Sequence, residues 1–138
     1  MGHLAADSPF SFSFHKNINL TSTGICIYYD NVAKAFQNGD PEALANMFDD
    51  KITDPMSKDE IFAWAKGLFA QYGSATFEVE KLVLEHYDNK SAITLLTYRV
   101  ITSKQEGSFG GTERDYLTKL NESWLVSRWE QLPQASPN

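Results

Sequence analysis

The chain has 138 residues, 42% hydrophobic and 13% aromatic, which is the size and apolar content of one globular domain with a single core. Its 12 Lys and Arg against 18 Asp and Glu give a net charge of −6, which disfavours nucleic acid as a partner. The single cysteine, Cys26, excludes an intrachain disulfide, and we interpret it as a small buried hydrophobic residue in a reducing compartment. Without a long apolar run or a signal-like N-terminus, we expect a cytoplasmic protein with no membrane partner.

Residues 1 to 24 are rich in Ser, Asn and Thr, and alternating Phe and Ser predict a short strand or docking arm within a partly disordered segment. From residue 25, apolar residues at three- and four-residue steps predict a helix that ends at Asn38-Gly39. Asp40-Pro41 predicts the N-cap and first position of a second, short helix.

A brief extended piece over residues 51 to 54 precedes Pro55. Ser57 and Glu60 then form a capping-box pattern that predicts a third helix ending at Gly73. Three helices therefore precede every long strand.

The remaining chain changes to a two-residue period. It predicts strands over residues 76–87, 91–102, 112–120 and 124–132, joined by polar turns. The expected fold class is α+β: a curved antiparallel sheet of four long strands plus a short one, wrapped around three N-terminal helices. The domain is expected to span residues 25–133, with a frayed tail over 134–138.

The strand that contains residues 92–101 is apolar on both faces, since Leu96 and Tyr98 alternate with Ile93 and Leu95. Helices cover one face of a sheet, so the second face needs a ligand, a curl of the same sheet or another subunit. We favour a homodimer through this sheet over a filled monomeric interior.

The order of elements resembles the cone-shaped nuclear transport factor 2-like superfamily. The resemblance covers residues 27–132 and rests on three segments: Ala35 to Leu44 with its Gly-Asp break, Met47 to Asp50 followed by Thr53-Asp54-Pro55, and Asn121 to Val126. Within this superfamily, these segments most resemble the branch of ketosteroid isomerases and SnoaL-like polyketide cyclases.

This resemblance implies two acid–base residues. Asp54 matches the general-base Asp of the isomerases, and Asp115 falls where the branch places a strand Asp that acts as oxyanion donor or acid/base. The isomerase helix Tyr falls near Val32, which cannot donate a hydrogen bond, and this counts against steroid isomerisation in its usual form.

Both carboxylates also have structural interpretations. Asp54 before Pro55 suits a turn or a helix cap, and Asp115 suits an ion pair with a neighbouring basic residue such as Arg114 or Arg128. Catalysis would instead need a base near the carbon acid and a donor for the developing oxyanion.

Other residues resemble further members of the superfamily. Tyr28, Tyr29 and Asp30 are similar to first-helix residues of scytalone dehydratase-like proteins, but only His86 lies on a strand. Arg99 would bind an anion inside the cone or pair with a strand acid.

The candidate ligand-binding residues share aromatic or cationic character on predicted core elements: Tyr29, Trp64, Tyr98, Arg99 and Trp124. The His residues and Cys26 are too widely spaced for a metal site, and no cofactor motif is present in the sequence, so neither is expected. Two functions stay open: a pocket for a small apolar or carbonyl-containing ligand with cofactor-free isomerase or cyclase chemistry through Asp54 and Asp115, or a non-catalytic dimeric binding or assembly module.

Overall fold

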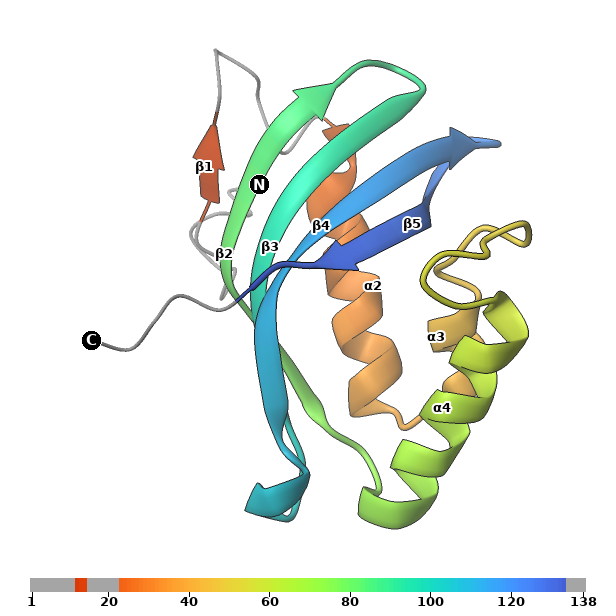
Figure 1. The fold of residues 1–138 in the computed structure, drawn as a ribbon, viewed down its shortest axis with the longest axis vertical. Coiled ribbons are helices and arrows are strands. Elements are labelled where there is room, and N and C mark those ends of the chain that lie inside the picture. The colour runs from red at the N-terminus through yellow and green to blue at the C-terminus, as the bar shows by residue number, and fades with distance from the viewer. Residues whose placement is uncertain (1–11, 15–22, 134–138) are drawn as a thin grey trace.

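The computed structural model describes residues 12–14 and 23–133, which form one curved sheet with three helices on its concave side (Figure 1). The partly disordered arm expected over residues 1–24 and the frayed tail expected over 134–138 lie outside the described residues, apart from residues 12–14 and 23–24. The α+β class expected from the sequence is confirmed.

The three helices begin and end where local chemistry predicts. Helix α2 spans Ile25–Gln37, α3 spans Pro41–Ala45 and α4 spans Lys58–Tyr72. Asp40 caps α3 by accepting a hydrogen bond from the Ala43 amide at 3.0 Å. At α4 the capping box is complete, because Ser57 Oγ accepts from the Glu60 amide at 3.1 Å and Glu60 Oε1 accepts from the Ser57 amide at 2.7 Å.

The sheet has five strands in the order β1-β2-β3-β4-β5. The short β1, Phe12–Phe14, pairs in parallel with β2, and all other neighbours are antiparallel. The long strands are β2 (Thr76–Tyr87), β3 (Ser91–Ile101), β4 (Phe109–Leu120) and β5 (Ser123–Gln131). Strand β4 begins three residues earlier than predicted, because Gly110 and Gly111 pair with Arg99 and Tyr98 rather than forming a loop.

The short extended piece predicted over residues 51–54 forms no strand. The contact with the sheet is made just before it, where Phe48 bridges Val126 and the Asp49 amide donates to the Val126 carbonyl at 2.9 Å. This bridge ties the loop after α3 to β5 and closes one end of the curved sheet.

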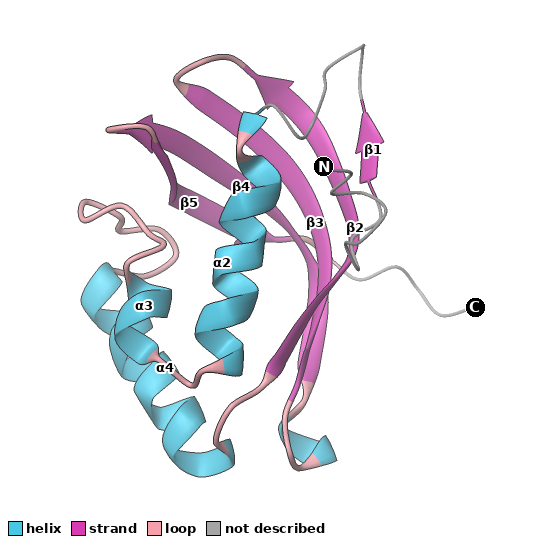
Figure 2. Cartoon of the chain, turned by 180° about the vertical axis from the view of Figure 1, so that it is seen from behind, coloured by secondary structure: helices cyan, strands magenta, loops and turns pink. Residues whose placement is uncertain are grey.

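Helix α2 lies along the inner, concave face of the sheet and supplies its core side chains Ile25, Tyr29, Val32 and Phe36 (Figure 2). Strand β3 alternates between buried inner residues and half-buried or exposed outer ones, as expected for a sheet covered on one face. Cys26 is buried, as its apolar surroundings predict. In the described part of the chain no helix is long and apolar enough to cross a bilayer.

We expect Ser57→Ala to lower the free energy of unfolding by about 1 kcal/mol, because it removes the side-chain acceptor of the capping box. Chemical denaturation measures this change. Ser123→Ala, at an exposed position at the start of β5, is the control and should leave the unfolding midpoint unchanged. Equal losses in the two variants would contradict the role of the cap.

Candidate functional site

A cavity of about 350 Å³ lies between the inner face of the sheet and helices α2 and α4. Most of its wall is apolar and much of that is aromatic. The apolar lining residues are Val32, Phe36, Leu44, Phe48, Met56, Ile61, Trp64, Phe77, Leu96, Val100, Phe109, Val126 and Trp129. The volume lies at the low end of the roughly 300–1,000 Å³ typical of small-molecule pockets.

The polar groups of the cavity centre on Asp115, in the middle of β4. Its side chain is only 1% exposed, and its Oδ2 accepts a hydrogen bond from the Tyr29 hydroxyl at 2.6 Å. The Tyr29 hydroxyl also lies 2.7 Å from Thr94 Oγ1 on β3. Helix α2 and two adjacent strands therefore meet at one buried carboxyl group.

A second carboxyl group, Glu113, lies two residues before Asp115 and also lines the cavity. Because side chains alternate along a strand, positions 113 and 115 share the inner face. The Gln131 amide on β5 donates to Glu113 Oε1 at 3.3 Å and to the Tyr98 hydroxyl at 2.9 Å. Each carboxyl group therefore accepts a hydrogen bond from a neighbouring element, Glu113 from Gln131 on β5 and Asp115 from Tyr29 on α2.

Burial raises the pKa of both carboxyl groups. The pKa of Glu113 rises to about 11, through desolvation first and then through the charge and hydrogen bond of Asp115. Desolvation also raises the pKa of Asp115, opposed by hydrogen bonds from Glu113 and Tyr29. If both carboxyl groups were ionised, neither could donate a hydrogen bond to the other, and Asp115 Oδ1 would have no hydrogen-bond partner among the described residues. We therefore interpret Glu113 and Asp115 as a pair that shares one proton.

No residue that lines the cavity in the described part of the chain is Lys, Arg or His. The arginines nearest to the pair along β4 and β5, Arg114 and Arg128, form ion pairs on the outer face of the sheet. Arg114 Nε lies 2.8 Å from Glu85 Oε1, and Arg128 Nε lies 2.9 Å from Asp54 Oδ2. Among residues 12–14 and 23–133, the inner carboxyl pair therefore has no cationic partner in the cavity lining.

Three of the ligand-binding candidates from the sequence line this cavity: Tyr29, Trp64 and Tyr98. Trp64 is 42% exposed and makes an edge contact with Phe109, with 5.9 Å between ring centroids, so these two rings lie on the solvent-facing side of the cavity. Val32 also lines the cavity, and the phenol that meets Asp115 comes from Tyr29, one turn earlier on the helix.

The other candidates lie elsewhere. The Asp54 side chain is 62% exposed, does not line the cavity and pairs with Arg128. Trp124 is buried at the far end of β5, where its indole nitrogen donates to the Thr23 carbonyl at 2.6 Å. His86 is exposed and lies 3.3 Å from Asp88 Oδ2.

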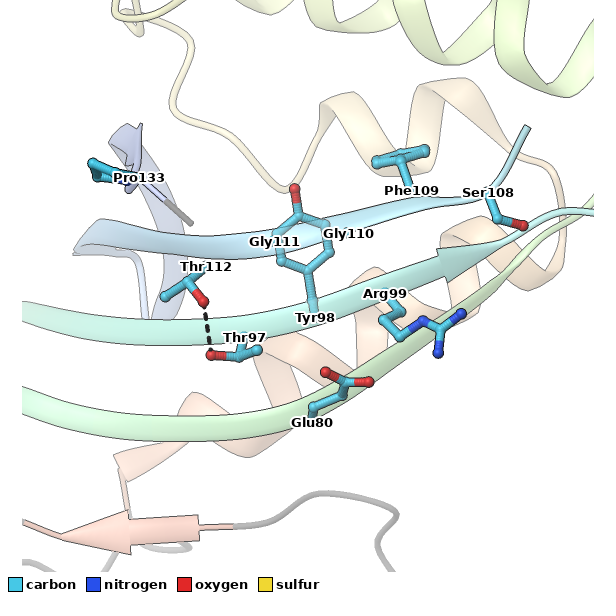
Figure 3. A pocket seen from close by; sticks show the side chains of 10 residues that line it. All are labelled: Glu80, Thr97, Tyr98, Arg99, Ser108, Phe109, Gly110, Gly111, Thr112 and Pro133. Atoms are coloured by element: carbon cyan, nitrogen blue, oxygen red, sulfur yellow. Dashed lines mark hydrogen bonds between the residues drawn. The ribbon is translucent and has the colours of Figure 1, made fainter. Parts of the chain in front are cut away.

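Arg99 belongs to a second hollow of about 540 Å³ whose strand residues Glu80, Thr97, Arg99 and Thr112 are drawn in Figure 3. The two threonines face one another across β3 and β4, with 3.1 Å between their hydroxyl oxygens. Arg99 follows Tyr98 directly, so alternation directs it away from the inner cavity. It is exposed, and its side chain does not enter the cone.

Sequence reasoning did not identify Glu113 and Gln131. The signal was present, because Glu113 and Asp115 are separated by one residue on a strand with a two-residue period. The intervening Arg114 instead suggested an ion pair with Asp115, whereas it points to the opposite face and pairs with Glu85. Within the described residues, no group of three or more His, Cys, Asp or Glu is placed to hold a metal ion.

No protein-family model and no curated protein sequence matches this chain. Solved structures do match it. Bd1075 from Bdellovibrio bacteriovorus superposes with a TM-score of 0.68 and 13% identity over 80% of this chain, which spans 40% of that protein. A domain of unknown function with a cystatin-like fold from Nostoc punctiforme matches with a TM-score of 0.66, 16% identity, and 88% and 82% of the two chains.

A candidate scytalone dehydratase from Novosphingobium aromaticivorans matches with a TM-score of 0.63 and 12% identity over 86% of this chain and 93% of that one. At these identities the comparisons establish the fold and not the activity. The chain has the cystatin-like α+β fold, which is the cone expected from its resemblance to the nuclear transport factor 2-like superfamily.

The carboxyl pair should make stability fall as pH rises. Between the ordinary pKa of 4.5 and the folded value of about 11, Glu113 binds more protons in the folded than in the unfolded state. The unfolding free energy then decreases with pH, by at most about 1.4 kcal/mol per pH unit for one proton. Asp115, whose pKa is also raised, contributes with the same sign.

Glu113→Gln should therefore flatten the fall of melting temperature between about pH 5 and about pH 9, measured by thermal denaturation. Glu85→Gln, on the outer face, is the matched control and should keep the wild-type slope. A Glu113→Gln slope equal to that of wild type would contradict a protonated Glu113 in the folded state.

Proposed function

We propose that this protein binds a small, mainly apolar carbonyl compound in its inner cavity and transfers a proton on it without a cofactor. The observation that carries the proposal is the pair of carboxyl groups, Glu113 and Asp115, at an apolar cavity of about 350 Å³. The likeness in fold to a candidate scytalone dehydratase is compatible with such chemistry but does not specify it.

The pair has the two groups that enolisation needs. A carboxylate can remove the proton next to a carbonyl, and a protonated carboxyl can donate to the carbonyl oxygen. We assign the carboxylate to Asp115, whose ionised form the Tyr29 hydroxyl stabilises by a hydrogen bond, and the acid to Glu113, whose pKa is raised to about 11 by burial and by the charge of Asp115.

In the proposed step the carbon–hydrogen bond breaks and its proton forms an O–H bond on Asp115. The electron pair of that bond becomes the carbon–carbon double bond of an enol, while the Glu113 proton passes to the carbonyl oxygen. In a substrate with a further carbon–carbon double bond conjugated with the enol, the Asp115 proton returns to the far carbon of that double bond while the enol O–H proton returns to Glu113, which restores the carbonyl group and gives an isomer. The aromatic walls exclude water and hold the ring system of the substrate.

We expect wild-type protein to accelerate exchange of the α-protons of the bicyclic ketone α-tetralone for deuterium from D₂O, followed by NMR. Asp115→Asn should slow this exchange by roughly 100-fold or more, because it removes the base. The matched control is Asp54→Asn, which removes an exposed acid outside the cavity. Exchange that is unaffected by Asp115→Asn, or abolished by Asp54→Asn, would overturn the assignment.

A non-catalytic assembly role is the second candidate, and one observation favours it. The outer face of β3 presents Ile93, Leu95 and Ile101, which are half-buried in the single chain. Leu95 lies opposite Arg114, which pairs with Glu85 on the same face. We propose a homodimer formed through this outer face of the sheet. We also propose that the protein is cytoplasmic.

The substitution Leu95→Arg, in the centre of the outer face, should convert a dimer into a monomer in sedimentation equilibrium, because it places an extra charge in the interface. Lys81→Arg, at an exposed position on the same face, is the control. A wild-type protein that is monomeric at all concentrations would rule out the dimer and leave the cavity proposal intact.

A further inference from the structure

We infer that the cavity selects organic cations, so that its ligand is a small cyclic or aromatic molecule that carries a protonated amine. This inference names the ligand class of the site proposed above and rests on the proposal that this site binds small molecules. It does not depend on whether the bound molecule reacts.

The first argument is the charge of the cavity. Two carboxyl groups line it, and none of the described residues in the lining is basic. With the one shared proton of our interpretation above, the pair carries one net negative charge in apolar surroundings. An anionic ligand would add a second uncompensated charge, whereas a cation would neutralise the first.

The basic residues nearest along the same strands do not compensate this charge. The side chains of Arg114 and Arg128 lie on the outer face and are engaged there by Glu85, Asp54 and Glu130. The net charge of −6 adds a negative potential around the whole chain. Cations are therefore favoured both during approach to the cavity and inside it.

The second argument is the number of hydrogen-bond acceptors in the pair. Asp115 is 1% exposed and lines the cavity, and apart from the proton that it shares with Glu113 its Oδ1 has no hydrogen-bond donor among the described residues. Each carboxylate oxygen can accept more than one hydrogen bond, and a buried one with too few donors is costly. A ligand ammonium group, which has several N–H donors and a positive charge, would supply the donors that this pair lacks.

The third argument is the wall. Nine of the nineteen lining residues are aromatic, and their ring faces attract cations within about 6 Å. The aromatic lining residues are Tyr28, Tyr29, Phe36, Phe48, Trp64, Phe77, Tyr98, Phe109 and Trp129. Pairs such as Phe48–Trp129 and Trp64–Phe109 place rings at an angle to one another, which gives a cation more than one ring to contact. A cavity for an uncharged hydrocarbon would have no need of the carboxyl pair.

The test uses three probes of nearly equal shape: naphthylmethylamine, naphthylmethanol and naphthoate, which are a cation, a neutral molecule and an anion at neutral pH. Their dissociation constants are measured with wild-type protein by isothermal titration calorimetry. We expect the amine to bind at least about tenfold more tightly than the alcohol, and the naphthoate to bind more weakly than both.

Two cavity variants and one matched control identify the source of the preference. Asp115→Asn and Glu113→Gln should each reduce the amine's advantage over the alcohol, with Asp115→Asn bringing the two affinities within about threefold. Asp54→Asn removes the same charge from the exterior and should leave the tenfold advantage unchanged. Circular dichroism confirms that each variant is folded, and Glu113→Gln serves if Asp115→Asn is not.

Equal affinities for amine and alcohol, or tighter binding of the naphthoate, would overturn the inference. An amine preference that Asp54→Asn removes as fully as Asp115→Asn would also overturn it, since general attraction to an acidic chain would then suffice. If α-tetralone undergoes exchange but the amine has no advantage, only the cation inference fails. If no probe binds and no exchange occurs, the proposed function fails with it.

Discussion

The hydrogen bond between the Tyr29 hydroxyl and the Asp115 carboxyl, at 2.6 Å, is the contact on which the interior of this cone depends. It joins the long helix α2 to the middle of β4, and through Thr94 it also reaches β3. A carboxyl group that is 1% exposed is tolerated in an apolar core only with such partners. Together with the apolar packing of α2, this contact holds the helix over the sheet at the cavity.

The charged side chains on the two faces of β4 have different kinds of partner. Arg114 points outward and pairs with Glu85, whereas Glu113 and Asp115 point inward, where their partners within the described residues are each other, Tyr29 and Gln131. Because buried acids without a compensating cation lower stability, a carboxyl pair in the wall of an apolar cavity is better explained by a ligand than by folding.

The sequence was sufficient for the helices, since Ser57, Asp40 and Gly73 act through contacts within a few residues. The sequence predicted the site less well, because the residues of β5 that face the cavity depend on how the inward and outward alternation of side chains continues past a β-bulge. Ser127 is an extra residue opposite β4, so Val126 and Trp129 both face inward although a strict two-residue period would separate them. The sequence around Asp54 resembles that around the general base of the isomerases, but the Asp54 side chain forms an ion pair with Arg128 outside the cavity. No local sequence pattern predicts an ion pair between residues so far apart in the chain.

The charge of the cavity also restricts which reactions suit it. Because no basic side chain lines the cavity in the part of the chain that the structure describes, a step that builds up a second negative charge would be opposed by the charge of the carboxyl pair at close range. A transfer in which Asp115 takes one proton while Glu113 gives up another keeps the total charge constant. Because the net charge of the pair stays constant along that path, a cationic group on the bound molecule would attract it in every state, so its main effect would be on binding and not on the barrier. Recognition through positive charge and proton transfer through the pair are therefore separable properties of one cavity.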